Sequence, residues 1–385
     1  MEKKGNGSEI RRIHAIIDER RYRGEEVFDF SLGSPGIKPM PEIMGILEEH
    51  LRTCTFGYNP SFGKNEIRER TAEYYSKKYG VPFRETDVFF SHGATGIINI
   101  LFRGIGEKGN NIVFPTPLFQ PPHTIWADRA GKIPKRVRTS EDFDLDLERI
   151  EHAIDKGTCA VFVNPGNNPT GRLYSEDVLE KLGGICEEKG VYLIVDNVYE
   201  GMEWTGKGGK PWWKFRNVIE VRSLSKSYNL AGLRIGWGVI HPDLEGKDEL
   251  LAKMRFIHEA DGYLCPNVFE GIVPEFLSLP EERIKEGMNE YRKRVKTMVN
   301  GLKEIGYEVE EPESTFYVWF KVPESYEGDD IKFCKKALEM NIGLVPGSSF
   351  GPGGEGYVRI SVGSSEIQEI EKSLDRFEKL YRGEI

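Results

Sequence analysis

The chain lacks the features of a secreted scaffold or a membrane protein. Its 385 residues contain five cysteines, and these lie far apart, without the close pairs that zinc sites and small disulfide-rich proteins require. No apolar run approaches the roughly 20 residues that span a bilayer. The polar start of the chain also lacks the apolar core of a secretory signal. We therefore expect a soluble, cytoplasmic protein with reduced thiols and no metal site.

A concentrated basic block is missing as well. The 53 Lys and Arg residues are outnumbered by 62 Asp and Glu residues, which gives a net charge of -9. Proteins that bind nucleic acid gather positive charge along one surface, so no nucleic-acid partner is expected. The length exceeds what one typical hydrophobic core accommodates, which predicts two domains in one globular unit.

The middle of the chain is patterned as a parallel sheet with helices on it. From about Gly93 to Gly238, short apolar runs alternate with amphipathic stretches, and this alternation is typical of α/β folds. Turn residues follow the apolar runs, where such sheets bind their ligands. Strands are predicted at 88–91, 111–114, 159–163, 191–196, 218–223 and 235–240, with a helix at 175–189 that Ser175 caps.

The last third of the chain has a different pattern. Apolar residues at helical spacing predict one long helix over 280–306 that links two lobes. Strands at 307–309, 316–322 and 357–362 and a helix at 331–340 then indicate an α+β tail. The first residues contain an amphipathic segment and an apolar run, and we expect them to join this tail. The predicted division is an N-terminal segment 1–40, a large domain 41–279 and a small domain 280–385.

A lysine-containing motif carries the strongest functional signal. Residues 223–238 read SLSKSYNLAGLRIGWG, so Lys226 stands among serines and Arg234 follows it closely. This combination joins a nucleophilic amine to a compact anion site. The alternative for any single lysine is a solvated position in a surface loop.

Two polar turns follow predicted strands. The apolar run 191–196 ends in Asp196, with Tyr199 three residues later, and the run 159–163 leads to an Asn-Pro-Thr-Gly turn that contains Asn168. Each can be a purely structural turn, because Asp, Asn, Pro and Gly favour turns. A buried carboxylate at a strand end can also hold a protonated ring nitrogen.

Another set of residues suits anions. Gly93, Ala94 and Thr95 form a small-residue turn between a predicted strand and a helix, and backbone N–H groups at a helix start bind phosphate. Arg359 lies in an alternating strand, where its planar fork suits a carboxylate. A surface ion pair is the alternative for Arg359.

These motifs, in this order and spacing from about Val27 to Ser361, resemble those of class I and II aminotransferases. The resemblance implies a fold type I α/β enzyme, with a mostly parallel seven-stranded sheet, that uses pyridoxal 5'-phosphate. It implies that Lys226 joins the cofactor as a Schiff base and that Asp196 binds its ring nitrogen. Tyr199 and Asn168 would bind its phenolic oxygen. The residues matched to the cofactor phosphate are Gly93, Ala94, Thr95, Ser223, Ser225 and Arg234.

Other positions also match those of the family. Phe119 falls where an aromatic ring stacks on the cofactor, although many relatives have Tyr or Trp there. Tyr58 resembles the residue that reaches the phosphate of the other subunit, which implies a homodimer with shared sites. Arg359 would bind the substrate α-carboxylate beside the substrate-loop glycine, Gly33. Some aspartate-specific relatives have a lysine where this chain has Ala94, so a dicarboxylate-only enzyme is not expected.

The implied reaction moves the amino group of an L-amino acid to a 2-oxo acid, with 2-oxoglutarate as the expected acceptor. It is a ping-pong mechanism in which the cofactor alternates between its pyridoxal and pyridoxamine forms. One alternative is another reaction on the same fold, such as C–S β-elimination, decarboxylation or a cyclisation like that of ACC synthase. A second is a non-catalytic regulator domain that binds the cofactor, but the residues before Val27 leave no room for the DNA-binding module it needs.

Overall fold

The computed structural model describes residues 9–106, 109–207, 209–261 and 268–384, and a seven-stranded sheet forms its centre. β8 pairs antiparallel with both of its neighbours, whereas the four other strand pairings are parallel. The expected α/β fold with a mainly parallel sheet is therefore confirmed. The strand order is β2 (Val88–His92), β8 (Ile235–Ile240), β7 (Val218–Ser223), β6 (Tyr192–Asp196), β5 (Thr158–Val163), β3 (Asn111–Thr116) and β4 (Ile133–Arg138).

Helices cover both faces of this sheet, which explains why the central strands β5 and β6 are apolar over most of their length. In β6, Leu193 and Val195 belong to one apolar core while Ile194 belongs to the core on the other face. The first core is closed by α2 (Pro41–Thr53), α3 (Asn65–Tyr79), α6 (Leu147–Ala153), α7 (Glu176–Glu188) and α9 (Val273–Leu277). The second is closed by α4 (Gly93–Gly104), the short α5 (Ala127–Arg129) and α8 (Lys247–Ala260).

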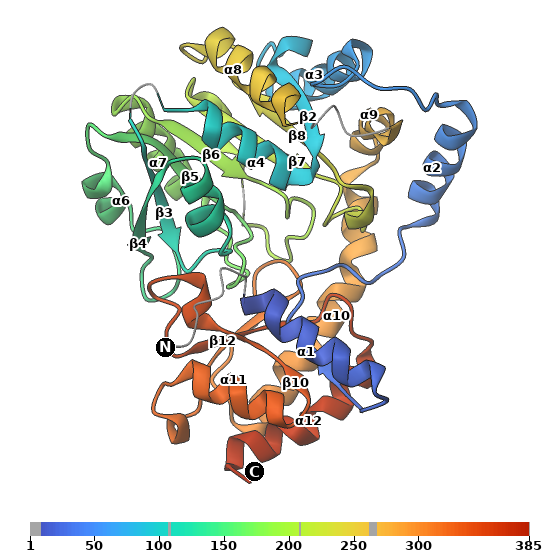
Figure 1. Ribbon diagram of the computed structural model, residues 1–385, viewed down its shortest axis with the longest axis vertical. Helices are drawn as coiled ribbons and strands as arrows, with labels where there is room; N and C mark the ends of the chain where they lie inside the picture. The colour runs from blue at the N-terminus through green and yellow to red at the C-terminus, as the bar shows by residue number, and fades with distance from the viewer. Residues whose placement is uncertain (1–8, 107–108, 208, 262–267, 385) are drawn as a thin grey trace.

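The C-terminal third forms its own apolar core below the large sheet (Figure 1). A three-stranded antiparallel sheet in the order β11-β12-β9 packs there with three helices. Its elements are α10 (Glu281–Ile305), β9 (Tyr317–Lys321), α11 (Asp330–Glu339), β10 (Ile342–Gly343), β11 (Val345–Pro346), β12 (Tyr357–Ser361) and α12 (Ile367–Arg382). This confirms the expected α+β character of the tail.

The N-terminal segment packs with this lower part. β1 (Phe28–Asp29) pairs in parallel with β10, and the Ser361 N–H donates to the Phe30 carbonyl at 2.9 Å. Helix α1 (Glu9–Tyr22) lies against the same elements (Figure 1). The first and last described segments therefore pack together, although the large sheet lies between them in the sequence.

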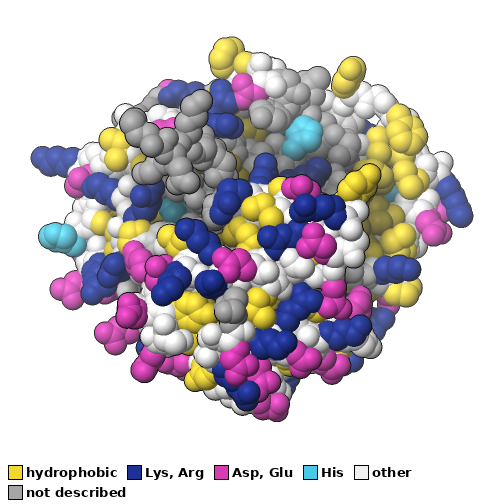
Figure 2. Space-filling view, turned by 60° about the horizontal axis from the view of Figure 1, so that its bottom comes forward, with side chains coloured by type: hydrophobic (Ala, Val, Ile, Leu, Met, Phe, Trp, Pro, Cys, Tyr) yellow, Lys and Arg dark blue, Asp and Glu magenta, His cyan; other side chains and the backbone are white. Residues whose placement is uncertain are grey.

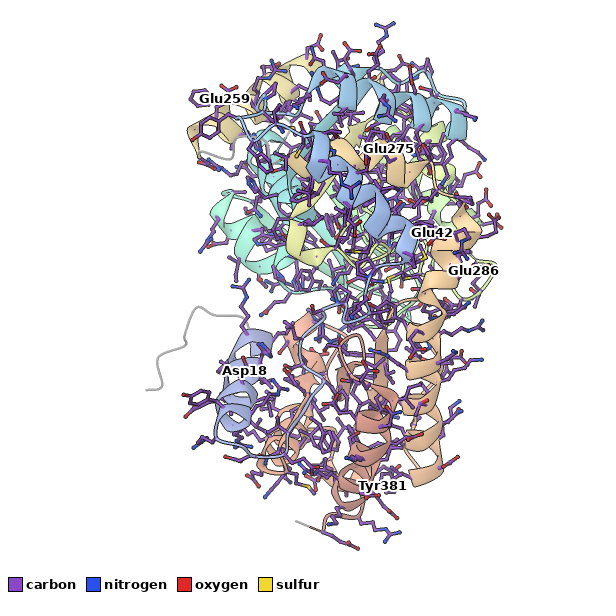
Figure 3. The ribbon with its side chains drawn as sticks, turned by 90° about the vertical axis from the view of Figure 1, so that its right-hand side faces the viewer. Asp18, Glu42, Glu259, Glu275, Glu286 and Tyr381 are labelled. Carbon is purple, nitrogen blue, oxygen red and sulfur yellow. The ribbon has the colours of Figure 1, made fainter. Side chains whose placement is uncertain are left out.

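The long helix α10 connects the two parts. Figure 3 shows it running from the level of Glu286, beside the large sheet, down along the C-terminal elements that end near Tyr381. Its buried side includes Ile284, which packs in the upper core, and Met288 and Val295, which pack in the lower one. The predicted helix 280–306 differs from the observed helix by one residue at each end.

One sequence expectation about strands was wrong, and one strand of the large sheet was not predicted. Residues 307–309 do not form a strand, since only Val309 makes an isolated bridge, to Phe320. Conversely, the strand β4 was not predicted. It lies at the edge of the sheet, and its residues are exposed or half-buried. An edge strand needs no continuous apolar run, so its sequence gives no clear strand signal.

The lower face of the molecule is densely charged. Figure 2 shows basic and acidic side chains next to one another on this face, in agreement with ion pairs such as Lys336–Glu339 on α11 and Arg382–Glu378 on α12. Within the described residues, no helix is both long enough and apolar enough to cross a bilayer.

Candidate active site

A cavity of about 1880 Å³ lies where the parallel strands of the large sheet end, and residues from the C-terminal third also line it. Most of the site residues expected from the sequence meet there. Gly93 stands directly beside it at the start of α4, whereas Tyr58 does not line it. The expected residues in the wall are Gly33, Ala94, Thr95, Phe119, Asn168, Asp196, Tyr199, Ser223, Ser225, Lys226, Arg234 and Arg359.

The topology explains this convergence. Because β5, β6 and β7 are neighbouring parallel strands, their carboxyl ends meet at one edge of the sheet. Asp196 is the last residue of β6 and Ser223 the last of β7. Asn164 follows β5 directly, and its side-chain amide donates to the Asp196 carbonyl at 2.7 Å.

Asp196 is buried and incompletely satisfied. Its Oδ1 atom has no hydrogen-bond partner among the described residues, although a buried polar atom is costly unless it is paired. Burial raises the pKa of this carboxyl group to about 7, and the Val198 N–H and the nearby Lys226 only partly offset that effect. The site therefore favours a cationic N–H donor opposite Oδ1, which would stabilise the carboxylate.

Lys226 places its amine within the same cavity. Its Nζ donates to the Gly33 carbonyl at 2.6 Å and lies 5.3 Å from the centre of the Phe316 ring. The Tyr199 ring is 5.8 Å from this nitrogen, and the Tyr199 hydroxyl hydrogen-bonds that of Tyr317 at 3.1 Å. The amine, the phenol and the Asp196 carboxylate thus face one space.

One end of the cavity suits an anion. Helix α4 begins at Gly93, so its first N–H groups lack partners within the helix. The Arg234 guanidinium lies over this turn so closely that a Cβ at Gly93 would stand 2.8 Å from Nη2. The Ser223 hydroxyl accepts the Ser225 N–H at 3.3 Å. A phosphate group would find N–H donors, hydroxyls and a cation together here.

Arg359 is a buried cation that lacks an acidic partner. Its side chain is 1% exposed; within the described part of the chain it forms no ion pair, and Asp29 acts on it only through its charge. Nη1 donates to Asn168 Oδ1 at 3.1 Å, and Nη2 donates to the Ser31 carbonyl. Burial lowers the pKa of this guanidinium. A carboxylate ligand is the chemical group that this arrangement lacks.

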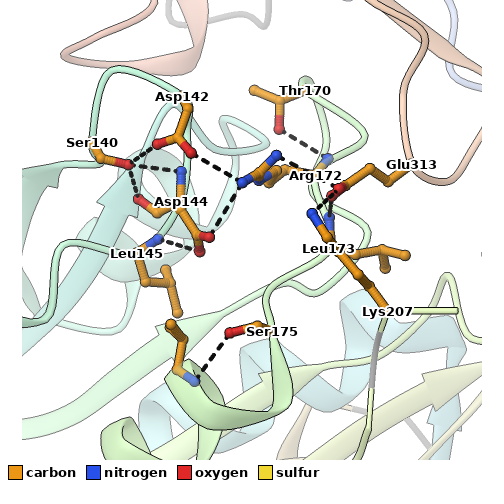
Figure 4. A network of polar contacts seen from close by, with 11 residues as sticks. Ser140, Asp142, Asp144, Leu145, Thr170, Arg172, Leu173, Ser175, Lys207 and Glu313 are labelled. Carbon is orange, nitrogen blue, oxygen red and sulfur yellow. Dashed lines mark hydrogen bonds and ion pairs between the residues drawn. The ribbon is translucent and has the colours of Figure 1, made fainter. Parts of the chain in front are cut away.

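The turn that bears Asn168 is held by a network of ion pairs on the outer side. Arg172, four residues further along, contacts Asp142 at 3.0 Å and Asp144 at 3.3 Å (Figure 4). Glu313 accepts the Leu173 N–H at 2.9 Å. Since Glu313 lies shortly before Tyr317, this network also ties the Asn168 turn to the small sheet.

Phe119 and Tyr58 have different surroundings. Phe119 is half-buried in the cavity wall and contacts Trp126 edge to face, with ring centres 6.2 Å apart. Tyr58 is 94% exposed in this chain. Gly33 packs tightly, because a Cβ there would come within 2.4 Å of the Tyr317 hydroxyl. This close approach explains why glycine stands at this position.

Several cavity residues were not anticipated from the sequence. Asn164 could have been noticed, since it is a polar residue directly after an apolar strand. Tyr317 gave no such signal, because it lies within an apolar run. The cations Arg11, Arg129 and Lys335 also line the cavity. They come from α1, α5 and α11, and only the tertiary structure brings these helices to one opening.

Comparison with known proteins agrees with this architecture. The model of the family "Aminotransferase class I and II" matches residues 26–377. An alanine aminotransferase structure from Pyrococcus furiosus superimposes with a TM-score of 0.89 at 27% identity and covers 98% of each chain. The fold is that of fold type I enzymes such as the aspartate aminotransferase of Thermus thermophilus, which has a TM-score of 0.87.

Sequence relatives point to the same group. An LL-diaminopimelate aminotransferase from Halothermothrix orenii is 30% identical over 94% of this chain and 93% of the relative. An aspartate aminotransferase from Pyrococcus horikoshii is 29% identical over 95% and 93%. The chain belongs to the class I and II aminotransferase family. It is an amino-group-transferring enzyme, and the resemblance noted in the sequence is confirmed.

Proposed function

We propose that the cavity binds pyridoxal 5'-phosphate and that the protein transfers the amino group of an L-amino acid to 2-oxoglutarate. One observation carries this proposal. A single cavity contains an amine, a buried carboxylate with an unpaired oxygen, and a buried guanidinium without an acidic partner among the described residues. Each of these groups matches one part of a cofactor–substrate pair.

The residues present fit the cofactor. Asp196 Oδ1 would receive the N–H of a protonated pyridine ring, which would satisfy a buried oxygen that now has no described partner. Asn168 and Tyr199 offer N–H and O–H donors for the phenolic oxygen. Phe119 offers a ring for stacking. The start of α4, Ser223, Ser225 and Arg234 would hold the phosphate.

The chain's own groups would then carry out distinct tasks. When bound, the cofactor withdraws electrons from the substrate α-carbon. Lys226, once its amine is free and neutral, would take the α-proton of the substrate on Nζ and hold it for return as a general acid. Asp196 keeps the ring nitrogen protonated, and Arg359 holds the α-carboxylate in place.

The charge of the cavity favours a dicarboxylic acceptor. Asp196 is the acidic residue in the described wall, and it is buried, whereas several basic residues reach the opening. Arg11, Arg129 and Lys335 are exposed there and come from three different helices. With Arg359 assigned to the α-carboxylate, these cations would attract a second carboxylate such as that of 2-oxoglutarate.

A homodimer with shared sites is part of the proposal. Phe56 is 77% exposed and Tyr58 94%, and Leu51 and Met44 on the neighbouring α2 are 46% and 41% exposed. A run of exposed apolar side chains favours a protein interface. In a dimer, Tyr58 would reach the phosphate of the partner's site.

We also propose that the chain divides at 40/41 and 279/280, which places the large sheet in one domain. Cys54, Cys159 and Cys186 are free thiols. Reduced thiols support a cytoplasmic location.

Covalent trapping tests the cofactor assignment. Purified protein reconstituted with pyridoxal 5'-phosphate is reduced with borohydride, digested and mapped by mass spectrometry. We expect the added mass on Lys226 alone. A label on another lysine, or no label on a protein that binds the cofactor, would contradict the assignment.

A panel of amino donors tests the reaction. Each donor is incubated with 2-oxoglutarate, and glutamate is measured together with pyruvate, ammonia and carbon dioxide. Transamination yields glutamate in amounts equal to the donor consumed. Pyruvate with ammonia would instead indicate β-elimination, and carbon dioxide would indicate decarboxylation.

A further inference from the structure

A second polar cluster lies behind the turn that bears Asp196 and Tyr199, on the side away from the cavity. Asn197, the residue after Asp196, is 3% exposed. Its side-chain amide donates to Glu220 Oε1 at 2.6 Å, and its backbone N–H donates to the Val221 carbonyl at 2.9 Å. Both bonds join the end of β6 to the middle of β7.

Glu220 is a buried carboxylate whose two oxygens are satisfied. It is 0% exposed, and while Oε1 accepts from Asn197, Oε2 accepts from the Trp213 indole N–H at 3.1 Å. Burial raises the pKa of Glu220 to about 7, and the Asn197 amide, the charge of Lys78 and the Trp213 indole limit this rise. A buried acid of this kind is stable only because its donors are fixed in place.

Glu200 makes a second connection between the same two segments. Its carboxylate pairs with Arg222 of β7, with Lys210, and with Lys78 at 3.1 Å. Its backbone carbonyl accepts the Ser227 hydroxyl. Ser227 is the residue after Lys226, so this bond reaches the lysine-bearing turn itself.

Along each of the two turns, residues that face the cavity alternate with residues that face the polar cluster. After β6, Asp196 and Tyr199 line the cavity, whereas Asn197 and Glu200 turn toward the cluster. Along β7 and its turn, Glu220 and Arg222 belong to the cluster, while the cavity side is formed by Ser223, Ser225 and Lys226. The contacts of the cluster therefore add to the β6–β7 ladder in holding the group assigned to the ring nitrogen beside the turn that bears the amine.

We propose that Asn197, Glu200 and Glu220 are positioning residues that lock the Asp196–Tyr199 turn against the Ser223–Lys226 turn. This inference rests on the proposed function, because it concerns how those turns are presented to the cofactor. The cluster touches neither cofactor nor substrate. Its loss is expected to weaken cofactor binding and to lower kcat more than it changes KM, since misplaced groups chiefly affect the transition state.

Glu220→Gln is the sharpest test, because glutamine keeps the size of glutamate but offers one acceptor and one donor. Either the Asn197 amide or the Trp213 indole then faces an N–H group. Replacing the indole by Trp213→Phe removes that conflict, so the introduced glutamine can again accept from Asn197. The double variant E220Q/W213F should restore cofactor binding even though it packs less well than the single variant.

Asp87→Asn is the matched control. Asp87 is also 0% exposed and is satisfied, by Lys247 at 2.6 Å and by the Arg84 N–H at 2.8 Å, but it does not line the cavity. The affinity of each apoprotein for pyridoxal 5'-phosphate is measured by calorimetry, and its thermal unfolding is followed without cofactor. The cofactor's absorbance spectrum across pH gives a third signal.

We expect E220Q to bind the cofactor about tenfold more weakly and to have a shifted spectral transition. The double variant should recover most of that affinity while its melting temperature falls further, and D87N should lose stability alone. If E220Q does not fold, Asn197→Ala replaces it, with the same expected loss of affinity. Unchanged affinity in the folded variants, or a double variant weaker than E220Q, would overturn the inference. A wild-type apoprotein that binds no cofactor would instead overturn the proposed function and the inference with it.

Discussion

The two sides of the β6 and β7 strand ends contain similar residues in opposite states. On the cavity side, Asp196 has a buried oxygen without a described partner, while behind it Glu220 accepts two N–H bonds. The pKa of each carboxyl group is raised to about 7 by burial. The same contrast holds for arginines, because Arg359 lacks an acidic partner in the described chain, whereas Arg222 is paired with Glu200.

This contrast distinguishes residues that wait for a ligand from residues that stabilise the surrounding structure. A buried polar group that the protein satisfies contributes to rigidity, whereas one left unsatisfied is destabilising until a ligand completes it. The perturbed pKa alone does not distinguish the two roles, since both carboxyl groups have it. What distinguishes the Asp196 and Glu220 carboxylates is whether both of their oxygens have hydrogen-bond partners.

The largest expected effect is that of Lys226→Ala. We expect turnover to fall by more than about 1000-fold, because the general base is lost, and the absorbance of the covalently bound cofactor to disappear. The melting temperature of the apoprotein should change little. Lys214→Ala, at an exposed position paired with Glu180, is the control and should keep wild-type turnover.

Replacing Arg359 and Arg222 in turn tests whether an unpaired and a paired buried arginine differ in their effect on stability. Arg359→Leu should lower kcat/KM for amino acids by about 2–5 kcal/mol of transition-state stabilisation. It should leave the apoprotein as stable as before or more so, because a buried cation without an acidic partner is costly. Arg222→Leu should destabilise the apoprotein by about 2 kcal/mol, since Glu200 loses its buried partner and keeps Lys78 and Lys210. Equal loss of stability in both variants would refute the contrast.

The two raised carboxyl pKa values predict how stability depends on pH. The folded apoprotein binds these protons up to about pH 7, whereas the unfolded chain releases them near 4. Their stabilising contribution is therefore complete below about pH 4 and is lost as the pH rises toward 7. Each group contributes a slope of up to about 1.4 kcal/mol per pH unit.

Urea unfolding of the apoprotein at several pH values measures this dependence. Asp196→Asn and Glu220→Gln should each remove one group's share of the slope. Cofactor binding should reduce only the part of the slope that comes from Asp196, because the cationic ring of the cofactor would stabilise the Asp196 carboxylate. A slope that neither substitution changes would show that other groups dominate.

The smallest effect is expected at the mouth of the cavity. Arg129→Ala should lower kcat/KM for 2-oxoglutarate by up to about fivefold, since exposed ion pairs contribute little, and should leave kcat/KM for pyruvate unchanged. The ratio of the two acceptors is the measurement. Equal changes for both acceptors would assign Arg129 another role.

Much of this organisation could be read in the sequence because it depends on neighbours along the chain. Hydrophobic periodicity predicted the buried strands and helix α10, since burial on both faces or on one stripe imposes a repeat. The edge strand β4 escaped prediction because partial exposure removes that repeat. The motifs around Lys226, Asp196 and Asn168 were visible because each turn requires Gly, Pro, Asn or Asp in a fixed order.

The sequence by itself thus determined the family, the long helix α10 and the buried strands of the large sheet, including the residues that end β6 and β7. The tertiary structure alone decided which buried polar groups have partners. Asp196 and Glu220 look alike in sequence, each within or at the end of an apolar strand. One meets a cavity and the other meets Asn197 and Trp213, and such contacts between distant segments follow from packing, which no local pattern records.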